Sequence, residues 1–425
     1  MHDQQRFVSR QLENGITLHS FEAPFPITCF ELLLPVGAGH AHSGNGFIGG
    51  SPHFLEHTQL LRTEKYPEAY SLDRLIGLRG GHSNGTTYPT STHFEIDVPS
   101  PYAYFGYETL LERTFHPLFK EQDLISERTV VINERNARRF YPGRSEASRY
   151  YHTEFLNDAE YPLEQLFGSD ADLETMDCLL LQKMQQQISF SRNIHVLAVG
   201  PNDLTELTKQ LEEITTKPTA FALSVEKVQW KDPTYRVLYY DTVAQPTLEV
   251  AWSYPRLDYE EFRALSLLVS LLVNPTHGAL HQRYREERGW TYGLDGYCQQ
   301  RTHNTVIGLS FPVNDLDQVD YIRHELAEQI AKAVANPALV EAEVSRYLSS
   351  QVYNYQTSSD VIGGASYDLD TYGRIHSEDE WSSAVKRALD PDWLKYIAST
   401  YLDPSVMGAI CFMPERRKLI PVRNS

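Results

Sequence analysis

The sequence predicts two α+β domains in one chain, and three observations lead to this fold class. Its 425 residues exceed what one hydrophobic core usually organises. Both halves open with short runs typical of strands and continue with longer, apolar-periodic runs typical of helices. The apolar runs 196–201 and 409–414 occupy similar late places in the two halves, which hints at a duplicated fold.

The first half is predicted to begin with a hairpin. Two alternating stretches within residues 7–22 flank Asn14 and Gly15, a dipeptide typical of tight hairpin turns. Apolar periodicity and run length predict the elements that follow. They are strands at 30–34, 92–98 and 194–199, a glycine-rich loop at 37–50, and helices at 102–114, 121–140, 173–188 and 203–214.

A further helix is predicted to follow the glycine-rich loop. Ser51 can cap its start, and Pro52 suits the first helical position. The run His53-Phe54-Leu55-Glu56-His57 is therefore expected in the opening turns of this helix.

The second half is predicted to start after a linker. The stretch 215–219 reads Thr-Thr-Lys-Pro-Thr, a composition typical of a connecting segment. We therefore expect an N-terminal domain at 1–214, a linker at 215–232 and a C-terminal domain at 233–425. Strands are predicted at 236–240, 248–254 and 408–412, with apolar-periodic helices between them.

Composition excludes several classes of function. The chain has 38 basic and 56 acidic residues, a formal net charge of -18, so nucleic acid and anionic membranes would be repelled. The four cysteines form no CxxC pair and predict neither a disulfide framework nor a thiolate metal site. The chain lacks a leader-like start and any apolar stretch near 18 residues, which predicts a soluble, cytoplasmic protein.

His53 and His57 are the first candidate metal ligands. Residues four apart lie on one face of a helix, at the separation that two ligands of one zinc ion require. Glu56 lies one turn from His53, where its carboxylate can reach a metal-bound water without binding the metal. The alternative is a surface helix that starts with polar residues, because three fixed letters also arise by chance.

A third ligand is expected from the predicted helix 121–140. Glu127 and Glu134 are seven residues apart and share one face of this helix, among several apolar residues. Acidic groups on so apolar a helix are costly to bury unless a positive charge compensates them, and a divalent cation would do so. Ion pairs with the neighbouring arginines are the alternative.

The pieces together resemble the pitrilysin and insulysin zinc peptidases, the HxxEH inverzincins. The resemblance covers nearly the whole chain, and its motifs are mutually spaced as in that family. It implies one zinc ion per chain, held by His53, His57 and Glu134, with Glu56 as the general base. Glu127 resembles the auxiliary acidic residue of the family.

The resemblance also implies residues that contact a peptide substrate. The segment 80–87 looks like the family's substrate strand, so Asn84, Gly85 and Thr86 are expected to bind the peptide by backbone pairing. Arg285 and Tyr292 resemble a pair that binds the substrate backbone and stabilises the reacting carbonyl. The alternatives are a simple turn at Asn84 and Gly85, and ordinary helix-end roles for Arg285 and Tyr292.

The family fold implies a metallopeptidase clamshell half: two similar α/β roll domains, each an antiparallel-rich sheet flanked by helices. Two such chains would form a closed chamber, as a homodimer or as a heterodimer with a related subunit, with Arg285 and Tyr292 acting in trans. Short bacterial members include subunits that resemble mitochondrial processing peptidases and a peptidase of subtilosin-type bacteriocin maturation. Precursor processing is therefore the expected role.

Three residues depart from the family pattern. Pro52 replaces a small residue, Thr58 a frequent methionine and Gly85 a common alanine. None of them is a ligand, so they bear on helix geometry and substrate preference. Two other functions stay open: a non-catalytic companion subunit of a heterodimeric peptidase, and a chaperone-like module that binds peptides without cleaving them.

Overall fold

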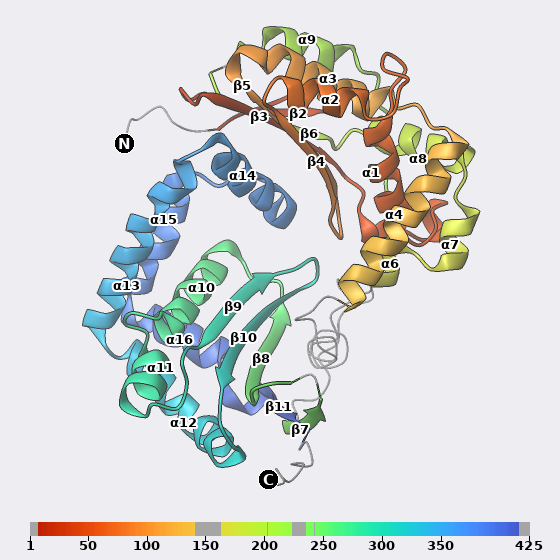
Figure 1. Ribbon diagram of the computed structural model, residues 1–425. Coiled ribbons are helices and arrows are strands. Elements are labelled where there is room, and N and C mark those ends of the chain that lie inside the picture. Colours follow the sequence, from red (N-terminus) through yellow and green to blue (C-terminus); the bar gives the residue numbers. More distant parts are fainter. Residues whose placement is uncertain (1–6, 141–162, 202, 223–234, 242, 416–425) are drawn as a thin grey trace, which may run out of the picture. The chain divides into compact units, whose positions relative to one another are not determined.

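The computed structural model describes residues 7–140, 163–201, 203–222, 235–241 and 243–415. They belong to two compact units, drawn in Figure 1. Unit 1 consists of residues 1–139, 162–226 and 351–378, and unit 2 of residues 140–161, 227–350 and 379–425. Each unit has one sheet with helices packed on it, which confirms the α+β class.

A six-stranded sheet forms the centre of unit 1, in the order β1-β2-β6-β3-β5-β4. All neighbouring strands run antiparallel except β2 and β6. The predicted hairpin is confirmed by the pairing of β1 with β2. The strands are β1 (Val8–Gln11), β2 (Thr17–Phe21), β3 (Ile27–Leu34), β4 (His82–Thr87), β5 (Thr92–Pro99) and β6 (His195–Val199).

Helices cover one face of this sheet and form the main core with it. The side chains of β3 alternate: Phe30, Leu32 and Leu34 enter this core, whereas Cys29 and Leu33 face the opposite side. The helices of unit 1 are α1 (Ser51–Leu61), α2 (Ser71–Leu78), α3 (Ala103–Phe115), α4 (Glu121–Phe140), α6 (Leu163–Phe167), α7 (Asp170–Thr175), α8 (Cys178–Ser189), α9 (Thr205–Glu213) and α14 (Ser358–Tyr372).

The predicted cap of the helix that carries the histidines is wrong by one residue. Gly50, with a φ of 75°, is the N-cap of α1, so Ser51 and Pro52 are already helical. The Ser51 hydroxyl instead donates to the carbonyl of Ile48, at 2.7 Å. Glycine suits this position because an added Cβ would lie 2.4 Å from the backbone of Phe167 and Gly168.

The predicted helix 173–188 is two helices, α7 and α8. Asp177 lies between them in an extended conformation, and its carboxylate accepts a hydrogen bond from the amide of Leu180 at 2.7 Å. An aspartate in this role begins a new helix. The periodicity of the sequence did not reveal this break.

The opposite face of the sheet in unit 1 is covered by α14 (Figure 1), which comes from the second half of the chain. A buried ion network joins the two. His93 on β5 donates to Glu31 on β3 at 2.6 Å and to Asp370 on α14 at 3.0 Å. Ser366 on α14 also donates to Glu31. Burial lowers the pKa of His93, but the hydrogen bonds to Asp370 and Glu31 outweigh it and raise the pKa to about 9.

Unit 2 repeats the topology of unit 1. Its sheet has the order β7-β11-β8-β10-β9, and only β7 and β11 pair in parallel. This order matches β2-β6-β3-β5-β4, so β11 takes the place of β6, as the similar runs in the sequence suggested. The strands are β7 (Tyr235–Tyr240), β8 (Thr247–Pro255), β9 (Asp295–Gln300), β10 (Asn304–Pro312) and β11 (Gly408–Pro414).

The helices of unit 2 pack on one face of its sheet, with α10 against β9. The longer ones are α10 (Tyr259–Val273), α12 (Leu316–Val334), α13 (Pro337–Ser350), α15 (Glu378–Lys386) and α16 (Pro391–Tyr401), and α11 (Ala279–His281) is a short turn. Among the helices of the described chain, none is long and apolar enough to cross a membrane.

Residues 221 and 222, within the predicted linker 215–232, pack on unit 1. The amide of Ala222 donates to Asn45 at 3.0 Å, and the ring of Phe221 stacks on Phe47 with ring centres 5.9 Å apart. Residues 223–232 of the predicted linker lie outside the described residues. The domain limits 1–214 and 233–425 stay a prediction.

The raised pKa of His93 predicts a pH-dependent stability. The charged imidazole stabilises the fold fully below its ordinary pKa of 6.5, and this stabilisation is lost as the pH rises through about 9. The free energy of unfolding should therefore fall by at most about 3 kcal/mol over that interval. Chemical denaturation at a series of pH values measures this slope. A His93→Gln variant with the same slope would contradict the assignment to His93.

Candidate metal centre

The candidate metal centre lies where α1 meets α4, and three residue pairs join the two helices. Just beyond α1, Arg62 forms a bidentate ion pair with Asp123, with distances of 2.6 and 3.0 Å. Within the helices, His57 meets Glu127, and His53 approaches Glu134. From one pair to the next, the residue numbers decrease along α1 and increase along α4. The two helices therefore run antiparallel to one another.

The structure brings the three predicted ligands together. The Oε2 atom of Glu134 lies 3.6 Å from the Nε2 of His53 and 3.4 Å from the Nε2 of His57. The three ligand atoms lie within 4.8 Å of one another. Two imidazoles and one carboxylate with an open side are the ligand set of a catalytic zinc site. Among the described residues, this is the one cluster with such geometry.

The charge around these atoms suits a cation. Burial lowers the pKa of His57, but hydrogen bonds to Glu127 and Glu134 outweigh it and raise the pKa to about 10. The nearby charge of Glu56 acts in the same direction. Three carboxylates around two imidazoles thus leave negative charge that a divalent ion would balance, so the residues fit a zinc ion.

The arginines next to the acidic residues on α4 bind elsewhere. Arg128 donates to the carbonyl of Leu173 at 2.8 Å. Arg135 donates to the carbonyl of Gly168 at 2.8 Å and pairs with Asp170. Arg128 and Arg135 therefore do not compensate Glu127 and Glu134. The side chains of Arg138 and Arg139 lie outside the described residues, so ion pairs with neighbouring arginines stay an alternative for Glu134.

Glu56 lies on α1 against the edge strand β4. Its side chain is 5% exposed, and its Oε2 accepts a hydrogen bond from the Thr87 hydroxyl at 2.8 Å. A Cβ added to Gly85 would lie 2.6 Å from the other carboxylate oxygen. Gly85 therefore leaves the space that the Glu56 carboxylate occupies.

The segment 82–87 is a strand, so the alternative of a simple turn at Asn84 and Gly85 is wrong. In the described sheet, β4 pairs only with β5, which leaves its other side as an edge. Gly85 and Thr87 face Glu56, whereas strand alternation turns Asn84 and Thr86 to the opposite face. The Asn84 side chain hydrogen-bonds Glu95 there. Of the predicted substrate residues in this strand, only Gly85 therefore faces the candidate base.

Three further residues support the centre and escaped the sequence analysis. Thr87 holds Glu56, as described above. Tyr70 donates from its hydroxyl to Glu127 at 3.2 Å, and it is the one non-glycine residue of the described chain with a positive φ, 59°. The ring of Phe167 packs edge-on against His53, with ring centres 5.0 Å apart. Nothing local in the sequence signals these contacts, because each partner lies more than 30 residues away or comes from another element.

Arg285 and Tyr292 lie in unit 2, close to one another. The guanidinium of Arg285 lies 4.9 Å from the centre of the Tyr292 ring, a cation–π contact. Arg285 also contacts His281, with 3.2 Å between the two nitrogens. The Tyr292 side chain is 87% exposed, so its hydroxyl is accessible for binding.

Unit 2 has different residues where unit 1 has its metal ligands. In the shared topology, α10 follows β8 as α1 follows β3. Its sequence YEEFRALSLLVSLLV contains no histidine, and its buried side is aliphatic. The duplicated fold therefore carries the candidate centre in unit 1.

Two family models match the chain one after the other. The model of insulinase, peptidase family M16, matches residues 30–165, and that of the peptidase M16 inactive domain matches residues 181–350. The first range contains the whole candidate centre, and the second contains Arg285 and Tyr292.

Similar proteins include peptidases of greater length. Protease 3 of Escherichia coli is 27% identical over 133 residues, which are 31% of this chain and 14% of that protein. The chain thus spans only a small part of this relative.

Solved structures show the same fold. A protease from Helicobacter pylori has a TM-score of 0.79 at 20% identity, covering 97% of this chain and all of that one. The periplasmic protease PqqL from Escherichia coli has a TM-score of 0.76 at 14% identity, covering 97% of this chain and 48% of that one.

The geometry predicts one zinc ion per chain, with graded effects of three substitutions on α4. Glu134→Gln removes a ligand and should lower zinc affinity more than about a hundredfold, whereas Glu127→Gln, behind His57, should lower it about 10- to 100-fold. Glu121→Gln, on the exposed start of the same helix, is the control. Competition with a chelator, together with elemental analysis, measures all three. Equal zinc affinity of Glu134→Gln and the control would contradict the site.

Proposed function

The chain belongs to peptidase family M16, and from this we propose that it is a zinc-dependent endopeptidase with its metal held by His53, His57 and Glu134. The observation that carries the proposal is the convergence of these three residues beside a buried carboxylate, Glu56, and an edge strand. Metal-assisted peptide hydrolysis needs a metal site, a proton acceptor and an edge on which the peptide can pair.

The proposed chemistry divides among residues of both units. A bound zinc ion would supply a Lewis acid that polarises water and the scissile carbonyl. Glu56, held by Thr87, is the base that takes the proton of the attacking water and delivers it to the leaving amine. Glu127 orients His57 through a 3.1 Å hydrogen bond. Tyr292 would donate to the developing oxyanion and Arg285 would align the peptide.

We propose extended or unfolded peptides as substrates, including bacteriocin-type precursors. A peptide that pairs with the free edge of β4 contributes backbone hydrogen bonds, which do not depend on its side chains. Gly85 supports this mode because, without a side chain, it keeps the strand close to Glu56. A folded protein has no free backbone to offer such an edge.

A partner chain is part of the proposal. PqqL, a neighbour of the same fold, is about twice as long as the segment that this chain matches, and another solved structure is the first half of that protease. This supports a pair of such halves, as a homodimer or as a heterodimer with a related subunit, with Arg285 and Tyr292 acting across the pair. The cytoplasmic location stays a prediction from the sequence.

The second candidate function is a non-catalytic companion that binds peptides for another subunit. The match of residues 181–350 to an inactive-domain model favours it. The two functions differ in one outcome, because a companion would bind zinc or peptide without producing new peptide termini.

Replacing the base should abolish hydrolysis without releasing the metal. Glu56→Gln is nearly isosteric and cannot accept the proton, so kcat should fall by about a hundredfold or more. A quenched fluorescent peptide library measures cleavage, and elemental analysis follows zinc. Glu64→Gln, an exposed residue just after α1, is the control. Full activity of Glu56→Gln would rule out this base, and inactivity of the zinc-loaded native chain in every assembly would favour the companion role.

Filling the space beside Glu56 should impair catalysis. In Gly85→Ala the new methyl group would meet the carboxylate at 2.6 Å, so the base or the strand must move. Moving the base away from its position should lower kcat by about 10- to 100-fold, because proton transfer depends on precise placement. Zinc affinity should stay unchanged. Gly77→Ala on α2, where a Cβ would meet nothing within 4 Å, is the matched control. If both variants kept native kcat, Gly85 would have no role in placing the base.

A further inference from the structure

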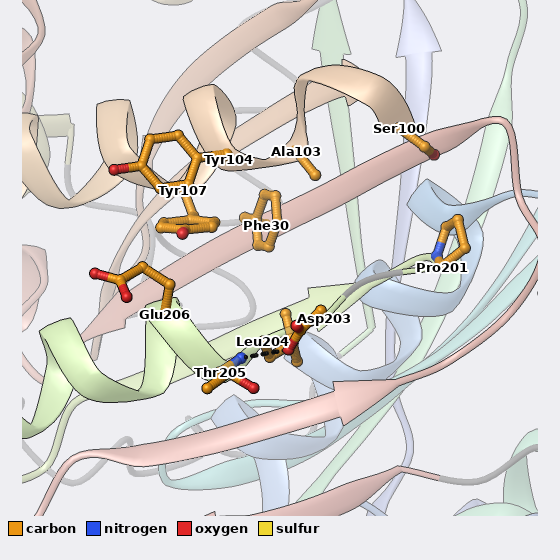
Figure 2. Close-up of a pocket in the computed structure, with 10 residues that line it drawn as sticks. All are labelled: Phe30, Ser100, Ala103, Tyr104, Tyr107, Pro201, Asp203, Leu204, Thr205 and Glu206. Carbon is orange, nitrogen blue, oxygen red and sulfur yellow. Dashed lines mark hydrogen bonds between the residues drawn. The ribbon is translucent and has the colours of Figure 1, made fainter.

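A pocket of about 510 Å³ lies in unit 1 (Figure 2). The start of α3 and the start of α9 form its sides, and Phe30 on β3 lies at its base. It shares no residue with the metal cluster or with β4. Its volume is within the usual range of about 300–1,000 Å³ for sites that bind small ligands.

Three aromatic rings give the pocket a preformed apolar wall. The ring centres of Tyr104 and Tyr107 are 5.1 Å apart, at an angle of 67°. Phe30 packs edge-on against Tyr107, with ring centres 5.8 Å apart. Phe30 and Tyr107 are buried, which fixes their rings. Such rings present electron-rich faces to alkyl groups and cations.

The opposite side of the pocket is acidic. Asp203 and Glu206 line it, and none of its lining residues is lysine, arginine or histidine. Asp203 accepts hydrogen bonds from the side chain and the backbone of Thr205, which lower its pKa and keep it charged. The hydrogen bond from the Thr205 amide accounts for Asp203, just before α9, and a first-turn position suits Glu206. These local roles at the start of α9 do not explain why both carboxylates line a pocket with aromatic walls.

The hydroxyl of Tyr107 is a second, independent sign of a ligand. The residue is only 4% exposed and lines the pocket. No group in the described part of the chain forms a hydrogen bond with its hydroxyl. Burial, followed by the negative charge of neighbours that include Glu206, raises its pKa to about 12. This oxygen is not among the enclosed polar atoms of the described chain, so it is reached from the pocket, and a ligand that donates to it would complete the site.

We propose that this pocket binds an alkylammonium ion. The ammonium group would lie between the Tyr107 hydroxyl and the carboxylates of Glu206 and Asp203, which together accept its three donors. The alkyl chain would pack on the rings of Tyr104 and Phe30. Either a free diamine or a lysine side chain of a peptide carries this chemistry.

Isothermal titration calorimetry of the full chain with 1,5-diaminopentane tests the proposal, with 1-pentanol as the neutral analogue. The diamine should bind at one site and the alcohol should not. Glu206→Gln should weaken binding about tenfold or more, and Tyr107→Phe, which keeps the ring, should weaken it severalfold. Glu213→Gln makes the same charge change on the exposed end of α9 and should leave binding unchanged.

A second titration distinguishes the two sources of the ligand. Tighter binding of N-acetyl-lysine methylamide than of the diamine supports a lysine side chain, and the reverse supports a free amine. Absence of diamine binding up to about 10 mM would overturn the proposal. So would equal binding by native protein, Glu206→Gln and Tyr107→Phe, with thermal melting showing that each variant is folded.

Discussion

The bidentate ion pair between Arg62 and Asp123 holds the start of α4 against the end of α1, and the candidate centre depends on the register that this contact sets. From Asp123, Glu127 is one turn further along α4 and Glu134 three turns further. The histidines occupy the matching turns of α1. A shift of α4 by one turn, about 5.4 Å, would move Glu134 away from both imidazoles. The metal centre is thus a consequence of helix pairing.

The sheet supplies the other half of the arrangement. The α1 helix packs against β4, so the carboxylate next to the metal ligands lies beside a strand with a free edge. In this chain, glycine at position 85 leaves room for the Glu56 carboxylate, and the hydroxyl at position 87 holds it. A peptide added to the edge would therefore run past the group proposed to activate water. The strand β4 would therefore serve both peptide binding and the placement of the proton acceptor.

Most of the features that could be predicted from the sequence depend on residues close together in the chain. The i,i+4 spacing of His53 and His57 and the seven-residue spacing of Glu127 and Glu134 each define one helix face, and local geometry is enough to see it. The start of α1 and the break between α7 and α8 were missed because a left-handed glycine and a capping aspartate decided them. Contacts such as that of Tyr70 with Glu127 join distant segments. Likewise, α14 packs on β3, where Ser366 contacts Glu31, 335 residues away in the chain. No local periodicity encodes such packing.

Duplication explains why one chain holds two similar sheets and one metal cluster among its described residues. The strand order recurs, but the helix after β8 kept an aliphatic face where α1 has its ligands. The most direct test is X-ray absorption at the zinc edge on the metal-loaded protein. Two imidazole nitrogens and carboxylate or water oxygens at about 2.0–2.2 Å are the expected shell. A shell with sulfur at about 2.3 Å, or with a single imidazole, would contradict a centre built on His53, His57 and Glu134.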